Sequence, residues 1–317
     1  MKRPIVRLSS LQLTNIKNVK NGTIYMPNTV NKILSADKAE ILGIYGQNGS
    51  GKTAIVDALY FLQKVMVGAD LDQSLEDYMT IDSDTAEIFA DFNIFMDGIV
   101  FEIGYTLSLS REEKEIVINR EILRSAKNEN GIRTNKTTFM DYQRDQTDVI
   151  FKPQKRLDEI LEANKEIKTD LIVARKMAEK SNCSYIFGES SREIFCREYK
   201  NGFQQFSVII SSLFEFALKD LFVIRNTHSG VISANFVLPM AFRIENDNIG
   251  AKGDFAVPLT EPILVDEERK NLLETIVEQI NIVLYTIIPG LQVTIKNYGK
   301  QSLDNGEEGW KLELMSK

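Results

Sequence analysis

The residues most suited to chemistry in this sequence form one short block: Gly46-Gln47-Asn48-Gly49-Ser50-Gly51-Lys52-Thr53. The block fits G-x-x-x-x-G-K-[ST], in which backbone N–H groups surround a phosphate. The glycines let the chain turn where a Cβ would clash, so that successive N–H groups can point at one anion. Lys52 adds a mobile cation for the outer phosphates, and the Thr53 hydroxyl suits Mg²⁺. The block therefore predicts a site for nucleotide phosphates and Mg²⁺.

The residues on either side of the block predict the elements that must position it. Residues 41–45 contain the apolar run Ile41, Leu42, Ile44 and Tyr45, which has the length of a buried strand. Residues 54–67 are expected to be a helix, because apolar side chains recur on one stripe: Ile55, Ala58, Leu59, Leu62, Val65 and Met66. Such a helix would place the positive end of its dipole at the phosphates. This context disfavours the alternative, a glycine turn with a chance lysine.

The composition limits the classes of protein to which the chain can belong. It has 317 residues, of which 43% are hydrophobic, and a formal net charge of −7. This favours one large or two interleaved globular domains and argues against a surface that is basic throughout, but leaves room for a local basic patch. Two cysteines, Cys183 and Cys196, and a single histidine disfavour a Cys/His metal site and suit reduced cytosolic thiols.

The sequence predicts neither a signal peptide nor a membrane span. Polar residues interrupt Pro4–Leu13, and the most apolar window, Phe206–Ile224, contains Glu215, Lys219 and Asp220. We therefore expect a cytoplasmic protein without a membrane partner.

The start of the chain is predicted to form two short strands. Residues 8–16 are strand-like, 17–22 form a turn, and 23–26 form a second strand that Pro27 ends. A polar loop then leads to the strand before the phosphate-binding block.

Period-two alternation predicts an antiparallel meander after the helix. Residues 68–83 are acidic and are expected to be a solvated connection. Residues 87–109 then alternate around the hairpin turn Asp97-Gly98, and 116–123 form a third strand. The Asn-, Lys- and Gly-rich stretch 125–136 is expected to be a loop.

The rest of the chain is predicted to be helical up to about residue 224 and to combine strands with one helix after it. Residues 155–180 suggest an exposed helical insert packed on one side, and 184–224 are expected to be mostly helical. Residues 231–244 return to a strand-like pattern, 267–288 form the most regular helix, and 291–314 contain a hairpin with an open edge at Trp310 to Leu314.

Two blocks of this sequence resemble the SMC-like ATPases of the ATP-binding-cassette superclass. Leu11-Gln12-Leu13-Thr14-Asn15-Ile16-Lys17-Asn18 is similar to their opening strand, L-x-[IL]-x-N-[FI]-[KR]. The phosphate-binding block, followed by Ala54-Ile55-Val56-Asp57-Ala58-Leu59, resembles their phosphate loop and first helix, and its Asn-Gly-Ser-Gly-Lys core favours this superclass over small GTPases. Within it, the chain looks most like the AAA-type, OLD-like ATPases of bacterial abortive-infection and other phage-defence systems.

The resemblance implies an α/β (α+β) fold: an ABC/SMC-type P-loop NTPase lobe with an antiparallel β subdomain and a helical insert. On this basis residues 1–124 are the first part of the ATPase lobe, 125–254 a mostly helical insert, and 255–317 the return to the lobe. It also implies ATP and Mg²⁺ as ligands, and a homodimer in which two heads sandwich nucleotide. Hydrolysis would switch an effector, often a nuclease.

The chain departs from this family where hydrolysis would take place. Leu107–Glu112 has no glycine and lies in the meander, so we reject it as the LSGG-like signature. Pro262–Glu267 imitates an acidic Walker B strand, in which Asp266 would hold Mg²⁺ through water and Glu267 would be the general base. However, Pro262 is unsuited to a central strand, and Asp266 is better explained as a helix cap. We therefore assign no catalytic residue and expect the C-terminal half of the family's lobe to be missing.

Other family positions are less well defined. Asn15 and Lys17 occur where the family brings its first strand near the nucleotide, but a strand end with a solvated lysine explains them equally well. His228 precedes the region of the switch histidine and suits a structural role. Gln143 and Gln146 lie in a loop and are not assigned as the nucleotide-sensing glutamine.

Two further functions stay open at this stage. The first is a non-catalytic, nucleotide-gated scaffold that binds a partner through the open strand edge or the Leu157 to Met177 helix. The second is an SMC-like DNA-repair ATPase, although no basic, aromatic-interleaved stripe indicates nucleic acid.

Overall fold

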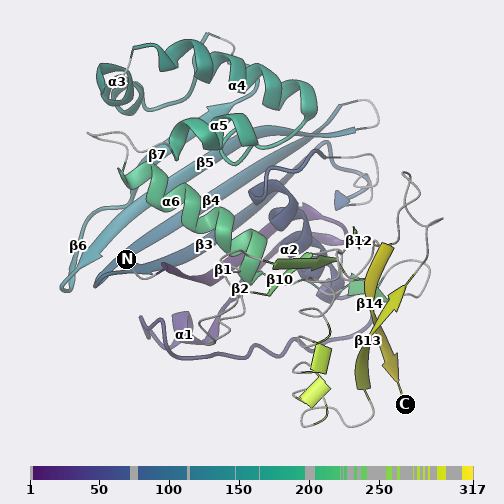
Figure 1. Ribbon diagram of the computed structural model, residues 1–317. Coiled ribbons are helices and arrows are strands. Elements are labelled where there is room, and N and C mark those ends of the chain that lie inside the picture. Colours follow the sequence, from purple (N-terminus) through teal and green to yellow (C-terminus); the bar gives the residue numbers. More distant parts are fainter. Residues whose placement is uncertain are drawn as a thin grey trace. The chain divides into compact units, whose positions relative to one another are not determined.

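The computed structural model describes residues 3–71, 78–112, 115–146, 148–163, 165–196 and 204–221, and short stretches between 223 and 316 (Figure 1). The chain divides into two compact units, Met1–Leu221 and Phe222–Lys317. The boundaries expected at 124 and 254 differ from this division. The strand β5 (Glu115–Glu129) runs through the first of them, and the second lies outside the described residues.

The first unit is built on a seven-stranded antiparallel sheet. The strand order is β2-β1-β3-β4-β5-β6, and β7 also pairs with β5. The other strands are β1 (Ile5–Ile16), β2 (Val19–Tyr25), β3 (Thr85–Met96), β4 (Ile99–Glu112), β6 (Ile132–Arg133) and β7 (Thr137–Gln143). This sheet confirms the predicted antiparallel meander and the mixed α/β class.

Two two-residue turns join neighbouring strands of this sheet and fix their pairing. Asp97-Gly98, predicted from the sequence, joins β3 to β4, with φ values of 47° and 81°. Asn130-Gly131 joins β5 to β6 with φ values of 52° and 80°. Consecutive positive φ values match the twist of a hairpin, and Asp-Gly and Asn-Gly adopt them readily. The loop expected over 125–136 is therefore wrong, because β5 continues along β4 as far as Glu129.

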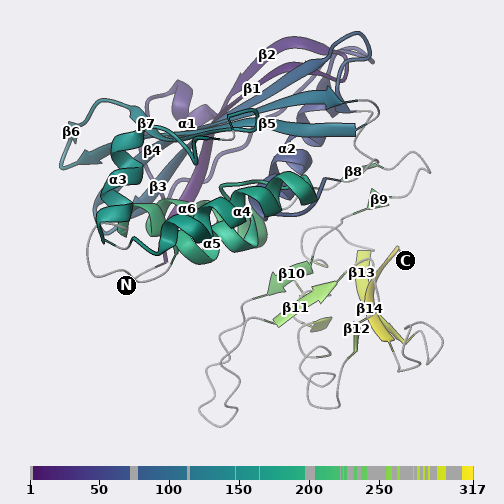
Figure 2. The ribbon, with the colours of Figure 1, turned by 90° about the horizontal axis from the view of Figure 1, so that it is seen from above.

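One face of this sheet forms the core. In β3, Ile88, Ala90, Phe92 and Ile94 are buried and alternate with more exposed residues, as period two requires. Figure 2 shows the helical layer on this side. The helices are α2 (Lys52–Met66), α3 (Gln154–Ala163), α4 (Ile167–Ser181), α5 (Glu189–Phe195), α6 (Gln204–Glu215) and the π-helix η2 (Phe216–Asp220).

The helical segment predicted at 155–180 is confirmed as the two helices α3 and α4. Helix α4 packs on one side only, as expected: Leu171 and Ala178 are buried, whereas Val173 and Met177 are about half exposed. The buried Arg175 attaches α4 to the loop after β7, donating to the carbonyl oxygens of residues 143, 144, 149 and 150. The predicted helical character of 184–224 is confirmed by α5, α6 and η2.

A buried carboxylate joins the sheet to the segment between α4 and α5. Glu121 in β5 is 0% exposed and accepts hydrogen bonds from Tyr105 Oη at 2.6 Å, Ser184 Oγ at 2.6 Å and the Tyr185 backbone N–H at 2.7 Å. Burial raises the pKa of Glu121, although these donors favour its charged form. Glu121 thereby holds residues 184 and 185 against the buried face of the sheet.

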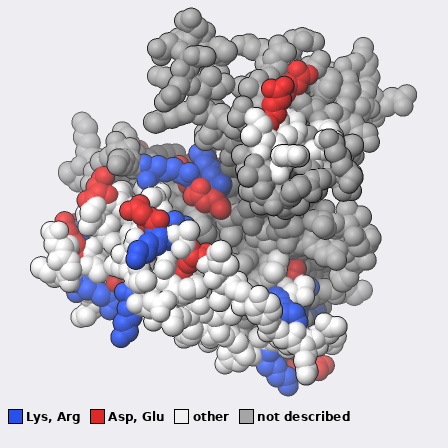
Figure 3. All heavy atoms as spheres, turned by 90° about the horizontal axis from the view of Figure 1, so that it is seen from below, with Lys and Arg blue, Asp and Glu red and all other residues white. Residues whose placement is uncertain are grey.

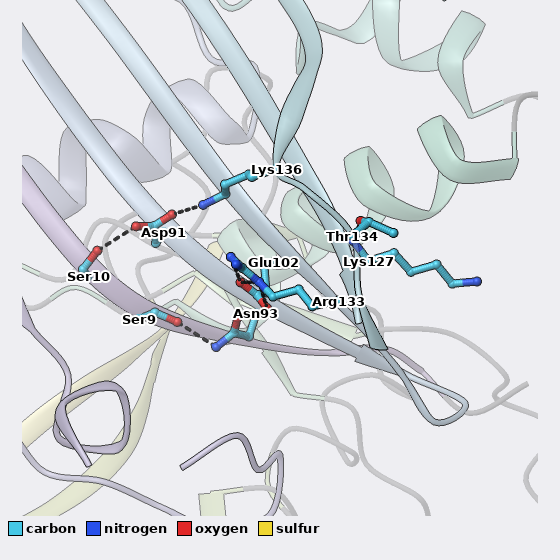
Figure 4. A network of polar contacts seen from close by, with 9 residues as sticks. All are labelled: Ser9, Ser10, Asp91, Asn93, Glu102, Lys127, Arg133, Thr134 and Lys136. Carbon is cyan, nitrogen blue, oxygen red and sulfur yellow. Dashed lines mark hydrogen bonds and ion pairs between the residues drawn. The ribbon is translucent and has the colours of Figure 1, made fainter. Parts of the chain in front are cut away.

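The opposite face of the sheet carries a network of polar contacts (Figure 4). Arg133 donates from Nε and Nη2 to the Glu102 carboxylate, and Lys136 reaches across Gly104 to Asp91. A Cβ at Gly104 would lie 3.1 Å from Lys136 Nζ, so the absence of a side chain there leaves room for this crossing. Because these pairs are partly exposed, each contributes little to stability.

Some local expectations at the start of the chain were wrong. The second strand begins at Val19, because the turn after β1 takes only Lys17-Asn18. A short helix, α1 (Pro27–Val30), occupies part of the expected polar loop. Residues 68–83 are not wholly solvated, since Tyr78 and Met79 are buried against the end of β1.

The second unit contains short antiparallel pairs: β8 (Arg225–Asn226) with β9 (Ile232–Ser233), and β10 (Val237–Met240) with β11 (Phe255–Pro258). The predicted C-terminal hairpin is confirmed by β13 (Leu291–Asn297) and β14 (Gly309–Ser316). The open edge expected at Trp310 to Leu314 is wrong at Trp310, because β12 (Ile263–Leu264) pairs with that end of β14. The described positions within the expected helix 267–288, from Glu274 to Tyr285, are helical.

Within the part of the chain that the structure describes, no helix is long and apolar enough to cross a membrane.

Candidate phosphate-binding site

The glycines of the phosphate-binding block adopt the conformations that the motif requires. Gly49 and Gly51 have φ values of 82° and 88°, in the left-handed region that side chains disfavour. A Cβ at Gly46 would lie 2.7 Å from Ser50 Oγ, which shows how tightly the block turns. Gly51 is the N-cap of α2, so the loop ends at the positive end of that helix.

Alanine at the two glycines is expected to destabilise the protein unequally. Gly49→Ala meets no atom within 4 Å and should lose about 1–2 kcal/mol through the left-handed backbone alone. Gly51→Ala should lose more, about 2–3 kcal/mol, because its Cβ would lie 2.6 Å from Cγ2 of the stiff Val19 side chain. Urea unfolding of both variants measures the difference. Equal losses would show that Val19 does not press on the loop.

Lys52 lies over the loop. Its Nζ donates to the carbonyl oxygens of Gly46 and Gln47, both at 2.7 Å, and lies 3.4 Å from Ser50 Oγ. These contacts are exposed, so they are worth little in water and can be exchanged for phosphate oxygens. Thr53, in the first turn of α2, is also exposed. The cation and the hydroxyl thus lie beside the same helix N-terminus.

The β1–β2 turn braces this loop from the other side. Asn18 Nδ2 donates to the Gly49 carbonyl oxygen, and Val19 contacts Gly51 as described above. Lys17 Nζ pairs with Asp57, whose side chain is 7% exposed, and lies 5.3 Å from the centre of the Tyr78 ring. The turn therefore contacts Gly49 in the loop and Asp57 in the second turn of α2, and Val19 at the start of β2 lies beside Gly51.

Two residues, one at the end of β1 and one in this turn, have strained backbones. Asn15 and Lys17 have φ values of 55° and 49°, which cost energy for residues other than glycine. Of the two residues flagged from the sequence, Lys17 is held at α2 by Asp57, whereas Asn15 Nδ2 donates to Thr85 O in β3 at 3.0 Å. Sequence reasoning missed Asn18. Its position at the end of the quoted Leu11–Asn18 block was the available signal.

The expected strand before the loop does not form. Residues 41–47 have no regular secondary structure, and Ile41 and Tyr45 are 91% and 94% exposed. Apolar strands are stable when another strand pairs with them, and none of the named strands pairs with this segment. An exposed apolar segment therefore leads directly into the phosphate-binding loop, where another polypeptide segment could cover it.

Within the described ranges, the other flagged residues do not add a catalytic group to this loop. Leu107–Glu112 is part of β4, as expected from the rejection of a signature loop, and Gln143 ends β7. Asp266, Glu267 and His228 lie outside the described residues. Ile263–Leu264, just before Asp266, pairs antiparallel with β14, whereas a Walker B strand should be central and parallel.

The two cysteines are the remaining candidates for site chemistry. Among the described residues, no group of three or more His, Cys, Asp or Glu side chains could hold a metal ion. Cys183 and Cys196 are free thiols, and burial raises the pKa of Cys183 to about 11. Both observations agree with protonated, reduced cysteines, since the thiolate is the reactive form.

One of the comparisons with known proteins includes the phosphate-binding block. Residues 41–169 match a family model described as an AAA domain, putative AbiEii toxin of a type IV toxin–antitoxin system. The search of curated proteins found no match. Solved structures also match, among them that of the recombination mediator protein RecF with ATP, of the RecFOR pathway, at 11% identity and a TM-score of 0.31. That match covers 99% of this chain and 76% of the RecF chain.

Proposed function

Because residues 41–169 match the model of an AAA domain and contain the phosphate-binding block, we propose that this chain is an ATP–Mg²⁺-binding lobe that controls an effector in phage defence. The observation that carries the proposal is the arrangement of Lys52. Its ammonium group lies against two carbonyl oxygens of the loop at 2.7 Å, beside the N-terminus of α2 and the exposed Thr53. A triphosphate supplies the anion that this cation and helix end can bind.

Each residue of the block has a role in this proposal. The backbone amides of residues 46–51 surround the phosphates, Lys52 moves from the loop carbonyls to the outer phosphate oxygens, and Thr53 ligates Mg²⁺. ATP supplies the phosphoryl group for transfer, which proteins catalyse mostly by positioning and charge stabilisation. With no signature loop or acidic parallel strand among the described residues, the lobe is expected to bind ATP but to turn it over poorly.

The exposed segment before the loop supports completion of the site by another polypeptide segment. Ile41, Ile44 and Tyr45 are all exposed and adjoin the phosphate-binding residues. We propose that further lobe residues cover this segment and that two ATP-loaded lobes form a homodimer, with hydrolysis switching a nuclease or other effector. The dimer, the effector and the defence role are expectations from the family resemblance.

Binding and turnover by the chain alone test the proposal. We expect titration calorimetry to detect Mg²⁺-dependent ATP binding and phosphate release to stay near the uncatalysed rate. Thr53→Ala should reduce the gain in affinity that Mg²⁺ provides by roughly tenfold, since one bond of ~1–2 kcal/mol is lost. Thr29→Ala, an exposed threonine in α1, is the matched control. Fast turnover that requires Lys52 would contradict this and promote Asp266 and Glu267 to catalytic candidates.

A nucleotide-gated scaffold is the second candidate. The exposed apolar side chains of Ile172, Val173 and Met177 on α4 favour it, because such a strip suits a protein partner. A DNA-repair role is less supported: on the face shown in Figure 3, basic and acidic side chains of the described residues are interspersed, without a continuous basic stripe. Salt-dependent DNA affinity would revive that role.

A further inference from the structure

Gln63 is a buried polar residue in the P-loop helix, far from the phosphate-binding end. It is 0% exposed, and its Nε2 donates to the carbonyl oxygens of Ala217 at 2.8 Å and Leu221 at 2.6 Å. These two acceptors fix the orientation of the amide, because a flipped amide would place its oxygen against both carbonyls. Its Oε1 is buried and makes no hydrogen bond within the described part of the chain. A half-satisfied buried amide is costly and calls for an explanation.

The acceptors are Ala217 in the π-helix η2 and Leu221, its C-cap residue, and in η2 the hydrogen-bond register shifts by one residue. The Leu221 N–H, which an α-helix would direct to Ala217, donates to Phe216 O at 2.7 Å. The Ala217 carbonyl oxygen accepts a hydrogen bond from Gln63 Nε2 instead of from the Leu221 N–H. Single π-turns inside α-helices occur frequently at functional sites. Here η2 lies at the C-terminal end of α6, and Gln63 holds it in the π register.

The position of this contact links two parts of the molecule. Gln63 lies eleven residues beyond Lys52 on one continuous helix, about 16 Å along its axis. Leu221 is the last residue of the first unit, from which the chain leaves for residues 222–317. Phe216 is held on the sheet by an edge contact with Phe92, with ring centres 5.7 Å apart. The start of η2 is thus fixed, and its end is held by Gln63.

We infer that Gln63 couples the phosphate-binding loop to the π-helix η2 at the C-terminal end of the first unit, with η2 as the element that changes register. A phosphate at the loop shifts α2, the rigid helix carries the shift to Gln63, and the bonds to Ala217 and Leu221 weaken or tighten. The hydrogen-bond register of residues 216–221 then changes. This inference rests on the proposed nucleotide binding.

Hydrogen exchange of the full chain, with and without Mg²⁺ and a non-cleavable ATP analogue, tests the coupling. We expect the exchange of the amides of residues 216–221 to change by at least about fivefold when nucleotide binds. Gln63→Met, which keeps the length of the side chain, should remove this response and leave the affinity of the loop for nucleotide nearly unchanged. If the methionine variant does not fold, Gln63→Leu removes the same two hydrogen bonds and serves in its place.

Arg3→Met is the matched control, because Arg3 bonds to Glu215 at the end of α6 and to Asp220 at the end of η2, and neither partner is on α2. This variant should keep the nucleotide response. If the wild type binds nucleotide but residues 216–221 do not respond, the inference fails and the proposed function stands. An unchanged response in the Gln63 variants, or its loss in Arg3→Met as well, also overturns the inference. If the wild type does not bind nucleotide, both proposals fail.

Discussion

Replacing Lys52 by alanine is expected to weaken the binding of Mg²⁺–ATP by roughly 10- to 100-fold. The loss follows from removing charge-assisted hydrogen bonds to phosphate, which contribute ~1.5–3 kcal/mol. Stability should change by less than ~0.5 kcal/mol, because the bonds of Lys52 to the loop carbonyls and to Ser50 Oγ are exposed. Titration calorimetry measures the first effect and urea unfolding the second.

Lys20→Ala is the matched control for this experiment. Lys20 is exposed on β2, close in sequence to the turn that braces the loop, and its removal changes the net charge by the same amount. The control should bind nucleotide like the wild type. Equal weakening by both variants would assign the effect to general charge, and undiminished binding by Lys52→Ala would place the nucleotide elsewhere.

The largest loss of stability is expected for Glu121→Met. This change leaves the buried donors of Tyr105, Ser184 and Tyr185 without an acceptor. An unmade buried hydrogen bond costs about 1–3 kcal/mol, so three donors should cost ~4 kcal/mol or more in the free energy of unfolding. Glu121→Gln, which keeps the shape and one acceptor oxygen, should lose much less. Urea unfolding at a fixed pH compares the two variants.

The contribution of Glu121 to the free energy of unfolding should decrease as the pH rises. Burial raises the pKa of Glu121 above its ordinary value of 4.5, so between these two values the folded state binds more protons than the unfolded state. The unfolding free energy that Glu121 contributes should therefore fall as the pH rises from 4.5 through the raised pKa, and then level off. Unfolding of the wild type and of Glu121→Gln at several pH values isolates this contribution. A wild-type advantage that grows with pH would contradict it.

The sequence predicted those elements that local patterns specify. The hairpin at Asp97-Gly98 could be predicted, because long stretches of alternating side chains flank the turn. The Asn130-Gly131 hairpin was missed, since β6 has only two residues and Ile132 is 76% exposed. Strand β7 was missed too. A short strand with little alternation gives no local signal, and its pairing with β5 depends on the rest of the sheet.

The candidate site shows the same division between local and long-range information. The glycine conformations and the helix after the loop follow from the motif itself. The contacts of Asn18 with Gly49 and of Lys17 with Asp57 depend on the register of the β1–β2 hairpin, which the sequence pattern placed incorrectly. The apolar run at 41–45 has the composition of a buried strand, but composition does not supply the neighbouring strand that would bury it.

A crystal structure of the chain with Mg²⁺ and a non-cleavable ATP analogue tests the central claim most directly. We predict that Lys52 Nζ leaves the carbonyl oxygens of Gly46 and Gln47 and binds the outer phosphate oxygens, with Thr53 on the Mg²⁺ ion. A loop without nucleotide at saturating analogue, with Lys52 still bound to its own carbonyls, would contradict the account.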